Sequence, residues 1–281
     1  MKKTLLALSI GTALSTAAYA QPTHQMELTV DAGRSANTSV DTQITDIQQT
    51  MYFSPVASNS APLLETAFIE KASSASIGYQ FDESEFDGSD EDRQVDTLNF
   101  GVRYIPQNTN LLLGYSRTQI DSERADIESD ADRQDIELGA YISDSSLLSL
   151  TYSEFDDNVS ADAITRGIKY KSVAELNNGM DLSTTVGYSE TDFGKTDADS
   201  WNLDAMVFPD RTLGLGVVYE TTSTELAVNS DADQRSHTYG VQVSKFFNTN
   251  FEVSGKVLNH EIEDNNTDES TQYLVGMNYR F

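Results

Sequence analysis

Apolar and polar residues alternate with a period of two along most of the chain. In the segment TLNFGVRYI, for example, Asn99 and Gly101 separate the apolar residues Leu98, Phe100 and Val102. Because successive side chains of a β-strand point to opposite sides, this alternation predicts strands with one apolar and one polar face. Over the whole chain it predicts fourteen strands, near residues 26–34, 42–53, 72–82, 95–105, 110–120, 134–143, 147–155, 163–173, 180–190, 200–208, 212–222, 236–246, 250–260 and 270–281. A short helix is expected within residues 61–71.

The predicted strands form hairpins that repeat about every 36 residues. One strand of each hairpin rises to a tyrosine, and these tyrosines are Tyr79, Tyr115, Tyr152, Tyr188 and Tyr219. The connections alternate between short ones with little acid, such as IPQNTN from Ile105, and longer acidic ones, such as DSERADIESDADRQD from Asp121. Turns at one end and loops at the other are typical of an up-and-down meander.

A soluble β-sandwich would show the same alternation, but its loops need not differ between the two ends. Tyrosines at a fixed height, a polar second face and unequal connections instead favour a barrel in a membrane, with the tyrosines as an aromatic girdle. Such a barrel must close, because an open edge would leave unpaired backbone groups in hydrocarbon. We therefore predict an all-β fold, a transmembrane antiparallel up-and-down β-barrel of about fourteen strands, with short periplasmic turns and longer acidic extracellular loops.

The first 20 residues have the pattern of a secretory signal peptide. Lys2 and Lys3 precede an apolar run, which ends in the small-residue motif Ala18-Tyr19-Ala20. We expect residues 1–20 to be cleaved and residues 21–281 to form a single barrel domain. The apolar run is too short for a spanning helix, and no later segment approaches the ~20 apolar residues that one requires.

Acidic residues dominate the charge of the chain. Without the two lysines of the signal peptide, 16 Lys and Arg oppose 45 Asp and Glu, a net charge of -29. This balance argues against a nucleic-acid partner, because phosphate binding requires basic residues. Acid clustered at the external loops raises the local cation concentration and predicts a cation-preferring pore. Ca²⁺ or Mg²⁺ at the loops and lipopolysaccharide are further candidate partners, whereas an adaptation to salt is the alternative explanation.

The last predicted strand ends in GMNYRF, with Tyr279 and Phe281 on the apolar face and Gly276 on the polar face. This ending resembles the terminal strand of Gram-negative outer-membrane proteins, which the barrel assembly machinery recognises. The resemblance implies insertion into the cell outer membrane, with Gly276, Tyr279 and Phe281 as the assembly signal; Leu274 departs from the pattern, which usually has a polar residue. Within this class the chain is most similar to the putative general bacterial porins.

The polar face of the strands would line the lumen of such a barrel. Five glycines at 101, 139, 167, 240 and 276 point inward by parity. Charged and amide side chains share this face, and we take Arg103, Asp135, Glu137, Lys169, Lys171, Asp204, Gln242 and Lys256 as the candidate pore lining. Barrels of 16 to 18 strands hold an aqueous channel, and fourteen strands lie close to that size. Passive diffusion of small hydrophilic solutes is therefore the expected function. A non-conducting surface or adhesion barrel, with acidic loops that bind divalent cations or lipopolysaccharide, is the alternative.

Catalysis and cofactors are not expected. The three histidines are His24, before the first predicted strand, and His237 and His260, near the outer rim; none has the spacing to serine or aspartate that enzymatic barrels use. The repeated Asp-Ala-Asp motif gives the metal candidates Asp130, Asp132, Asp197, Asp199, Asp231 and Asp233. It does not match an EF-hand, which needs glycine at loop position 6 and glutamate at position 12. We interpret the motif as a loop-to-strand junction, with divalent binding as the alternative.

Overall fold

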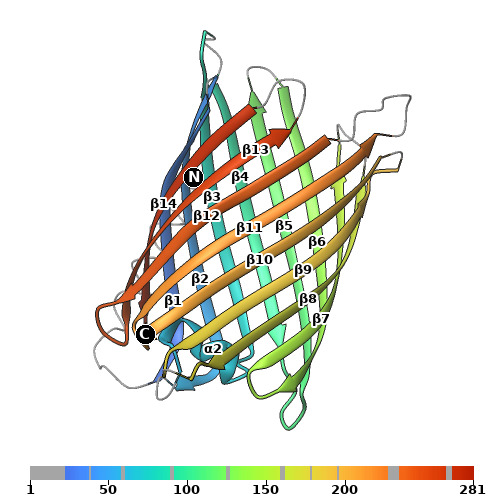
Figure 1. The fold of residues 1–281 in the computed structure, drawn as a ribbon. Helices are drawn as coiled ribbons and strands as arrows, with labels where there is room; N and C mark the ends of the chain where they lie inside the picture. Colours follow the sequence, from blue (N-terminus) through green and yellow to red (C-terminus); the bar gives the residue numbers. More distant parts are fainter. Residues whose placement is uncertain are drawn as a thin grey trace.

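The protein forms a closed barrel of fourteen antiparallel strands (Figure 1). The structure, a computed structural model, describes residues 23–37, 39–57, 61–88, 92–124, 127–158, 162–177, 179–194, 196–226, 234–263 and 268–281. The strands are β1 (Thr23–Ala36), β2 (Val40–Ala57), β3 (Ser74–Phe86), β4 (Asp92–Tyr104), β5 (Leu111–Arg124), β6 (Ile127–Ser143), β7 (Ser146–Asp157), β8 (Ala163–Glu175), β9 (Asp181–Asp192), β10 (Thr196–Asp210), β11 (Leu213–Leu226), β12 (Gln234–Phe246), β13 (Phe251–Glu263) and β14 (Asp268–Arg280). The predicted signal peptide lies outside the described residues and stays a prediction.

Each strand pairs with its neighbours in sequence, and β1 pairs with β14 to close the ring. In this seam Leu28 is the register partner of Tyr279 and Val30 that of Met277. Closure gives every strand two hydrogen-bonded neighbours, so the sheet has no open edge. The predicted antiparallel barrel of fourteen strands is therefore confirmed.

The strands extend further at the outer end than the sequence indicated. The stretch from Asp121, predicted as an acidic loop, is largely strand, because β5 continues to Arg124 and β6 begins at Ile127. Aspartate and glutamate are depleted in strands, so an acidic run by itself favours a loop. Where both faces of a hairpin meet water, however, alternating acids on paired strands remain compatible with the hydrogen-bond ladder. Much of the acid that we assigned to loops therefore lies on the strands themselves.

The outer surface carries an apolar band, and the inner surface is polar. Large side chains such as Leu138, Leu150 and Val241 are 53 to 60% exposed on the outside. Their neighbours along the strands, such as Glu137 and Gly240, point inward. This arrangement is the reverse of a soluble protein and matches a barrel whose outside faces lipid.

Between β2 and β3 the chain folds into the barrel mouth instead of making a short turn. Residues 61–72, which we call the inward segment, contain the 3-10 helix η1 (Leu63–Glu65) and the α-helix α2 (Thr66–Ile69). The helix expected within residues 61–71 is thus confirmed. No helix in the described part of the chain has the length and apolar character needed to cross a membrane.

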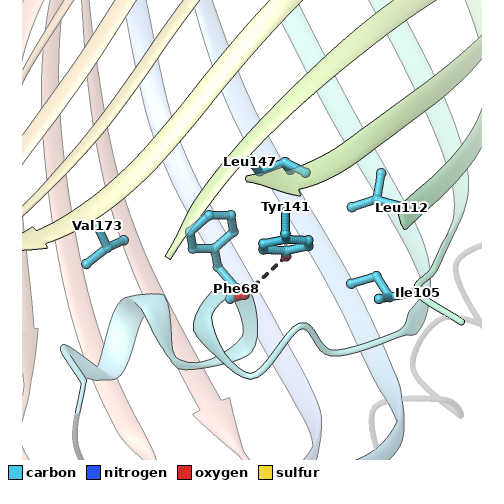
Figure 2. Close-up of a cluster of buried hydrophobic side chains, with 6 residues drawn as sticks. All are labelled: Phe68, Ile105, Leu112, Tyr141, Leu147 and Val173. Atoms are coloured by element: carbon cyan, nitrogen blue, oxygen red, sulfur yellow. Dashed lines mark hydrogen bonds between the residues drawn. The ribbon is translucent and has the colours of Figure 1, made fainter. Parts of the chain in front are cut away.

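The inward segment packs against the inner wall at the end of the barrel where the short turns lie (Figure 1). Its Phe68 belongs to a buried apolar cluster with Leu112, Tyr141 and Leu147, and the Tyr141 hydroxyl donates a 3.1 Å hydrogen bond to the Phe68 carbonyl (Figure 2). Val56 and Tyr52 of β2 form a second cluster with Ala72. These two clusters make up the largest apolar interior of the described chain.

Candidate functional site in the barrel lumen

The inner wall over β3 to β10 is hollowed, and both polar and apolar groups line the hollow. Inward glycines and hydroxyl side chains keep this part of the wall thin, among them Gly101, Gly114, Gly187, Ser76 and Ser116. Four of the eight candidate lining residues border this hollow, namely Arg103, Asp135, Glu137 and Lys169.

The charges along this wall are largely paired with one another. Lys169 Nζ lies 3.1 Å from Glu137 Oε1, and the Arg133 guanidinium lies 2.8 Å from Asp135 Oδ1. Arg103 donates a 3.4 Å hydrogen bond to the Tyr141 hydroxyl. Two of these three cations therefore lie next to carboxylates, whereas the hydroxyl beside Arg103 leaves its charge unbalanced.

Asp204 and Gln242 form a bridge over the next strand. Gln242 Nε2 donates a 2.9 Å hydrogen bond to Asp204 Oδ1 across β11, where the intervening residue is Gly216. A Cβ at Gly216 would lie 2.8 Å from Gln242 Cγ, so the glycine makes the bridge possible. Lys256 is the register partner of Gln242 on β13 and points to the same side.

Three inward carboxylates lie on consecutive strands at the other side of the lumen. Asp31 of β1 and Asp46 of β2 are direct register partners, and Asp82 lies on β3. Gln80 Nε2 donates a 2.8 Å hydrogen bond to Asp82 Oδ2. Within the described part of the chain, none of the three forms an ion pair. Our list of candidate lining residues omitted them, although parity in ELTVDAG would have placed Asp31 inward.

Lys171 contacts the inward segment rather than an open lumen. Its ammonium lies 2.7 Å from Glu65 Oε2 and 4.7 Å from the centre of the Phe68 ring. The Ser183 hydroxyl of β9 donates a 2.8 Å hydrogen bond to the other Glu65 oxygen. Glu65 is only 6% exposed, so its carboxylate depends on these two partners.

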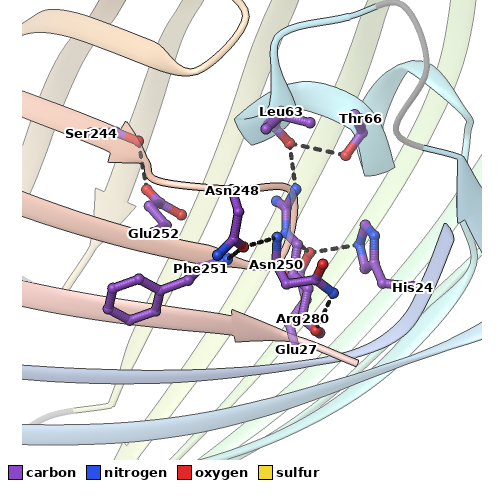
Figure 3. A network of polar contacts seen from close by, with 10 residues as sticks. All are labelled: His24, Glu27, Leu63, Thr66, Ser244, Asn248, Asn250, Phe251, Glu252 and Arg280. Atoms are coloured by element: carbon purple, nitrogen blue, oxygen red, sulfur yellow. Dashed lines mark hydrogen bonds and ion pairs between the residues drawn. The ribbon is translucent and has the colours of Figure 1, made fainter. Parts of the chain in front are cut away.

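A second polar network joins the inward segment to the barrel seam. Arg280 of β14 donates a 2.8 Å hydrogen bond to the Leu63 carbonyl and lies 2.9 Å from Glu27 Oε1 of β1 (Figure 3). His24 Nε2 lies 2.8 Å from the same Glu27 oxygen. The expectation that His24 precedes the first strand was wrong, because β1 begins at Thr23 and His24 is buried in it. Pairing with Glu27 and an edge contact with Tyr52 explain the burial of this histidine.

The repeated tyrosines lie on the outer surface, and four of them direct their hydroxyls toward the outer strand ends. Tyr79 donates to Asp96, Tyr188 donates to Glu190 and Asp199, and Tyr115 donates to Gln134. The Tyr219 hydroxyl oxygen lies 3.3 Å from His237 Nδ1. Tyr152 shares a register row with Tyr115 through Ile136, which pairs with both. An apolar ring below a polar hydroxyl suits the boundary between lipid and water.

Two of the four metal candidates that the structure describes are engaged by other side chains. Asp132 accepts hydrogen bonds from Arg117, and Asp199 accepts one from Tyr188. Asp197 and Asp199 lie at the start of β10, as a loop-to-strand junction requires, whereas Asp130 and Asp132 lie further into β6. No group of three or more His, Asp or Glu in the described ranges has an arrangement that could hold a metal ion. Asp231 and Asp233 lie outside the described residues.

Comparison with protein families decides the class of the barrel. Residues 1–160, more than half of the chain, match the family described as putative general bacterial porin. The chain belongs to this family of porins. None of the curated proteins compared with the porin matches it.

Solved barrels share the fold of the porin. The outer membrane protein Omp33 of Acinetobacter baumannii is 17% identical, with a TM-score of 0.60 over 92% of this chain and 99% of that one. The CymD monoaromatic hydrocarbon channel is 8% identical, with a TM-score of 0.54 over 92% and 89%. The COG4313 outer membrane channel of Pseudomonas putida F1 is 10% identical, with a TM-score of 0.51 over 93% and 97%. Family and fold together identify an outer-membrane channel of a Gram-negative bacterium, as the resemblance of the C-terminal strand implied.

The residues of the expected assembly signal lie in the seam of the porin. Tyr279 pairs with Leu28, and its ring lies 4.8 Å from that of Phe281. Gly276 lies on the inner face beside Asp31, its register partner, and an added Cβ would come 2.0 Å from Asp31 Oδ1. The glycine therefore makes room for a lumen carboxylate, a role that the sequence motif did not indicate.

Proposed function

We propose that the porin conducts small hydrophilic solutes by passive diffusion and prefers cations over anions. The observation that carries the preference is the row of carboxylates on β1 to β3, Asp31, Asp46 and Asp82. Like charges directly opposite one another on paired strands repel. In a wet lumen this repulsion is relieved by cations from solution, which therefore concentrate along this wall.

The facing strand β8 supports the same preference, because its two inward lysines are already paired with carboxylates. β1 and β8 lie seven strands apart in a ring of fourteen, so they face each other across the lumen. On β8, Lys169 is paired with Glu137 and Lys171 with Glu65. An anion that approaches β8 would have to compete with these carboxylates, whereas a cation meets carboxylates on β1 to β3 without ion pairs in the described part of the chain.

We further propose that the porin is not an enzyme and carries no cofactor. The three histidines support this, since His24 is bound to Glu27, His237 lies beside Tyr219 on the outer face, and His260 lies 2.9 Å from the Thr238 hydroxyl. A catalytic histidine needs a nucleophile within hydrogen-bond reach and a third group that orients its ring, and no such third group bonds to His260 among the described residues.

The proposed partners follow from the two ends of the barrel. Lipopolysaccharide would surround the outer face at the tyrosine girdle, and the assembly machinery would read Gly276, Tyr279 and Phe281 during insertion. At the acidic outer strand ends, divalent cations would act as mobile counterions rather than occupy a fixed ligand cage.

The inward segment favours a second candidate, a non-conducting surface barrel, because it occupies the mouth. Current through the purified porin in a planar bilayer under a KCl gradient separates the two functions. We expect a reversal potential whose sign shows that the pore is more permeable to K⁺ than to Cl⁻. A reversal potential set by Cl⁻ would refute the cation preference, and a folded barrel that stays silent even after excision of the inward segment would support the surface barrel.

A further inference from the structure

The inward segment contacts the inner wall on opposite sides of the barrel. It packs against Tyr52 and Val56 of β2, while Glu65 bonds to Ser183 of β9. β2 and β9 lie seven strands apart in the ring of fourteen, so the segment crosses the mouth from wall to wall.

The inward segment also contacts strands that lie between these two sides of the ring. Leu63 donates its N–H to the Arg211 carbonyl in the turn after β10, and its own carbonyl accepts from Arg280 of β14. Phe68 packs against Leu112 of β5 and Tyr141 of β6 (Figure 2). A segment held from so many strands lies in the path of any solute that leaves the lumen at the periplasmic end.

The attachments of the segment differ in how much their loss costs. The Phe68 cluster is apolar, and opening it exposes apolar surface to water. The bonds of Glu65 to Lys171 and Ser183 are polar, and water can replace them once the segment leaves the wall. A docked state held partly by replaceable polar bonds is suited to reversible opening.

We propose that the inward segment is the gate of this porin and that the Glu65–Lys171 pair is its latch. Docked, the segment closes the periplasmic mouth; undocked, it leaves the lumen continuous. This inference rests on the proposed channel function and adds its regulation. This ion pair is the attachment through which the gate can be regulated, because Glu65 is the buried charged residue of the segment and Lys171 belongs to the barrel wall.

Cross-linking tests the gate directly, since the chain contains no cysteine. In the double variant Glu65→Cys with Lys171→Cys, a short reducible thiosulfonate linker would fix the segment to β8. We expect the linker to suppress channel openings in a planar bilayer and a thiol reductant to restore them. The matched control links Arg117→Cys and Asp132→Cys on the outer face, where openings should not change. Openings that persist unchanged through a linked latch would overturn the gate.

Loosening the latch gives the complementary readout. Glu65→Gln should raise the open probability severalfold and leave the current of a single open channel unchanged. Glu70→Gln is the control in the same segment, because it makes the same change at an exposed carboxylate and leaves the bonds of Glu65 to Lys171 and Ser183 in place. An open probability that Glu65→Gln does not change would contradict the latch.

Replacement of residues 62–70 by a short glycine-serine linker distinguishes the proposed gate from the proposed channel function. Folding of this variant is checked by its heat-dependent mobility on a detergent gel. A larger steady current than in the intact porin supports the gate. Equal currents from both would overturn the gate and leave the channel function standing, whereas silence from both folded proteins would overturn the channel function itself.

Discussion

The Arg280 guanidinium donates a 2.8 Å hydrogen bond to the carbonyl of Leu63, 217 residues earlier in the chain. The same guanidinium pairs with Glu27 on β1 and lies over the Phe246 ring of β12. One side chain thus joins the closing strand, the first strand and the inward segment. Its 2% exposure means that these contacts replace water almost completely.

We expect Arg280→Gln to destabilise the porin by about 3 kcal/mol or more, because it leaves the buried Glu27 carboxylate without its guanidinium partner. Arg117→Gln on the outer face is the control, since exposed ion pairs contribute under about 1 kcal/mol. Urea-induced unfolding in lipid vesicles measures both. Similar losses in the two variants would show that burial of the Arg280 network adds nothing to its strength.

The double variant Asp31→Asn with Asp46→Asn should lower the ratio of cation to anion permeability roughly twofold or more, because it removes the facing carboxylates of β1 and β2. Reversal potentials under a KCl gradient give this ratio. The effect should fade in ~1 M salt, where the Debye length falls to about 3 Å. Asp132→Asn, on the outer face beside Arg117, is the control and should leave the ratio unchanged.

Gly240→Ala should cost about 1–3 kcal/mol, because the new Cβ would lie 2.1 Å from the Val257 carbonyl oxygen, which belongs to the backbone and cannot rotate away. Gly78→Ala is the matched control. Its nearest neighbours would be 3.8 Å from the new Cβ, so its stability should stay within ~0.5 kcal/mol of the parent. Unfolding midpoints of the two variants decide the matter, and equal midpoints would contradict the close approach at Gly240.

Removal of the Tyr188 ring should be more harmful than removal of its hydroxyl. Tyr188→Ala loses the contact with Trp201, whose ring centre lies 4.8 Å away, and such a pair contributes ~0.5–1.5 kcal/mol beyond its buried area. Tyr188→Phe loses only bonds to Glu190 and Asp199, which water can replace, so its effect should stay near ~0.5 kcal/mol. If Tyr188→Phe destabilises the vesicle-bound barrel as much as Tyr188→Ala, the girdle acts through its hydroxyls.

Calcium should not produce a saturable rise in thermal stability. Asp132 is bonded to Arg117 and Asp199 to Tyr188, so each would have to give up a partner to bind a metal ion. A calcium titration followed by the unfolding temperature tests this expectation. A stabilisation that saturates and is lost in Asp231→Asn with Asp233→Asn would show a metal site in the third copy of the motif.

The period-two pattern was enough to predict all fourteen strands and the inward side of residues such as Asp135 and Lys169. Alternation reports the two faces of a strand directly, so these features follow from local sequence. Strand ends were predicted less well. Beyond the membrane, a run of acidic residues can form either paired strands or a loop. The pattern alone does not separate these two states.

The inward segment shows what the sequence could not indicate. Its short helix was expected, but the bonds of Glu65 to Lys171 and of Leu63 to Arg280 join residues far apart in the chain. Only the closed ring brings these residues together. His24 was misplaced because β1 begins at Thr23, earlier than the alternation indicates; its partners Glu27 and Tyr52 lie on β1 and β2 and do not depend on closure of the ring.

The continuation of β5 and β6 past the tyrosine girdle gives the barrel a stiff outer wall in place of mobile loops. Carboxylates on a paired strand keep fixed positions, so the field that they produce does not average out through motion. Such a wall extends the distance at which an approaching cation is first attracted. The rate at which the rim captures cations should therefore fall as salt screens its charge, in addition to the loss of selectivity in the lumen.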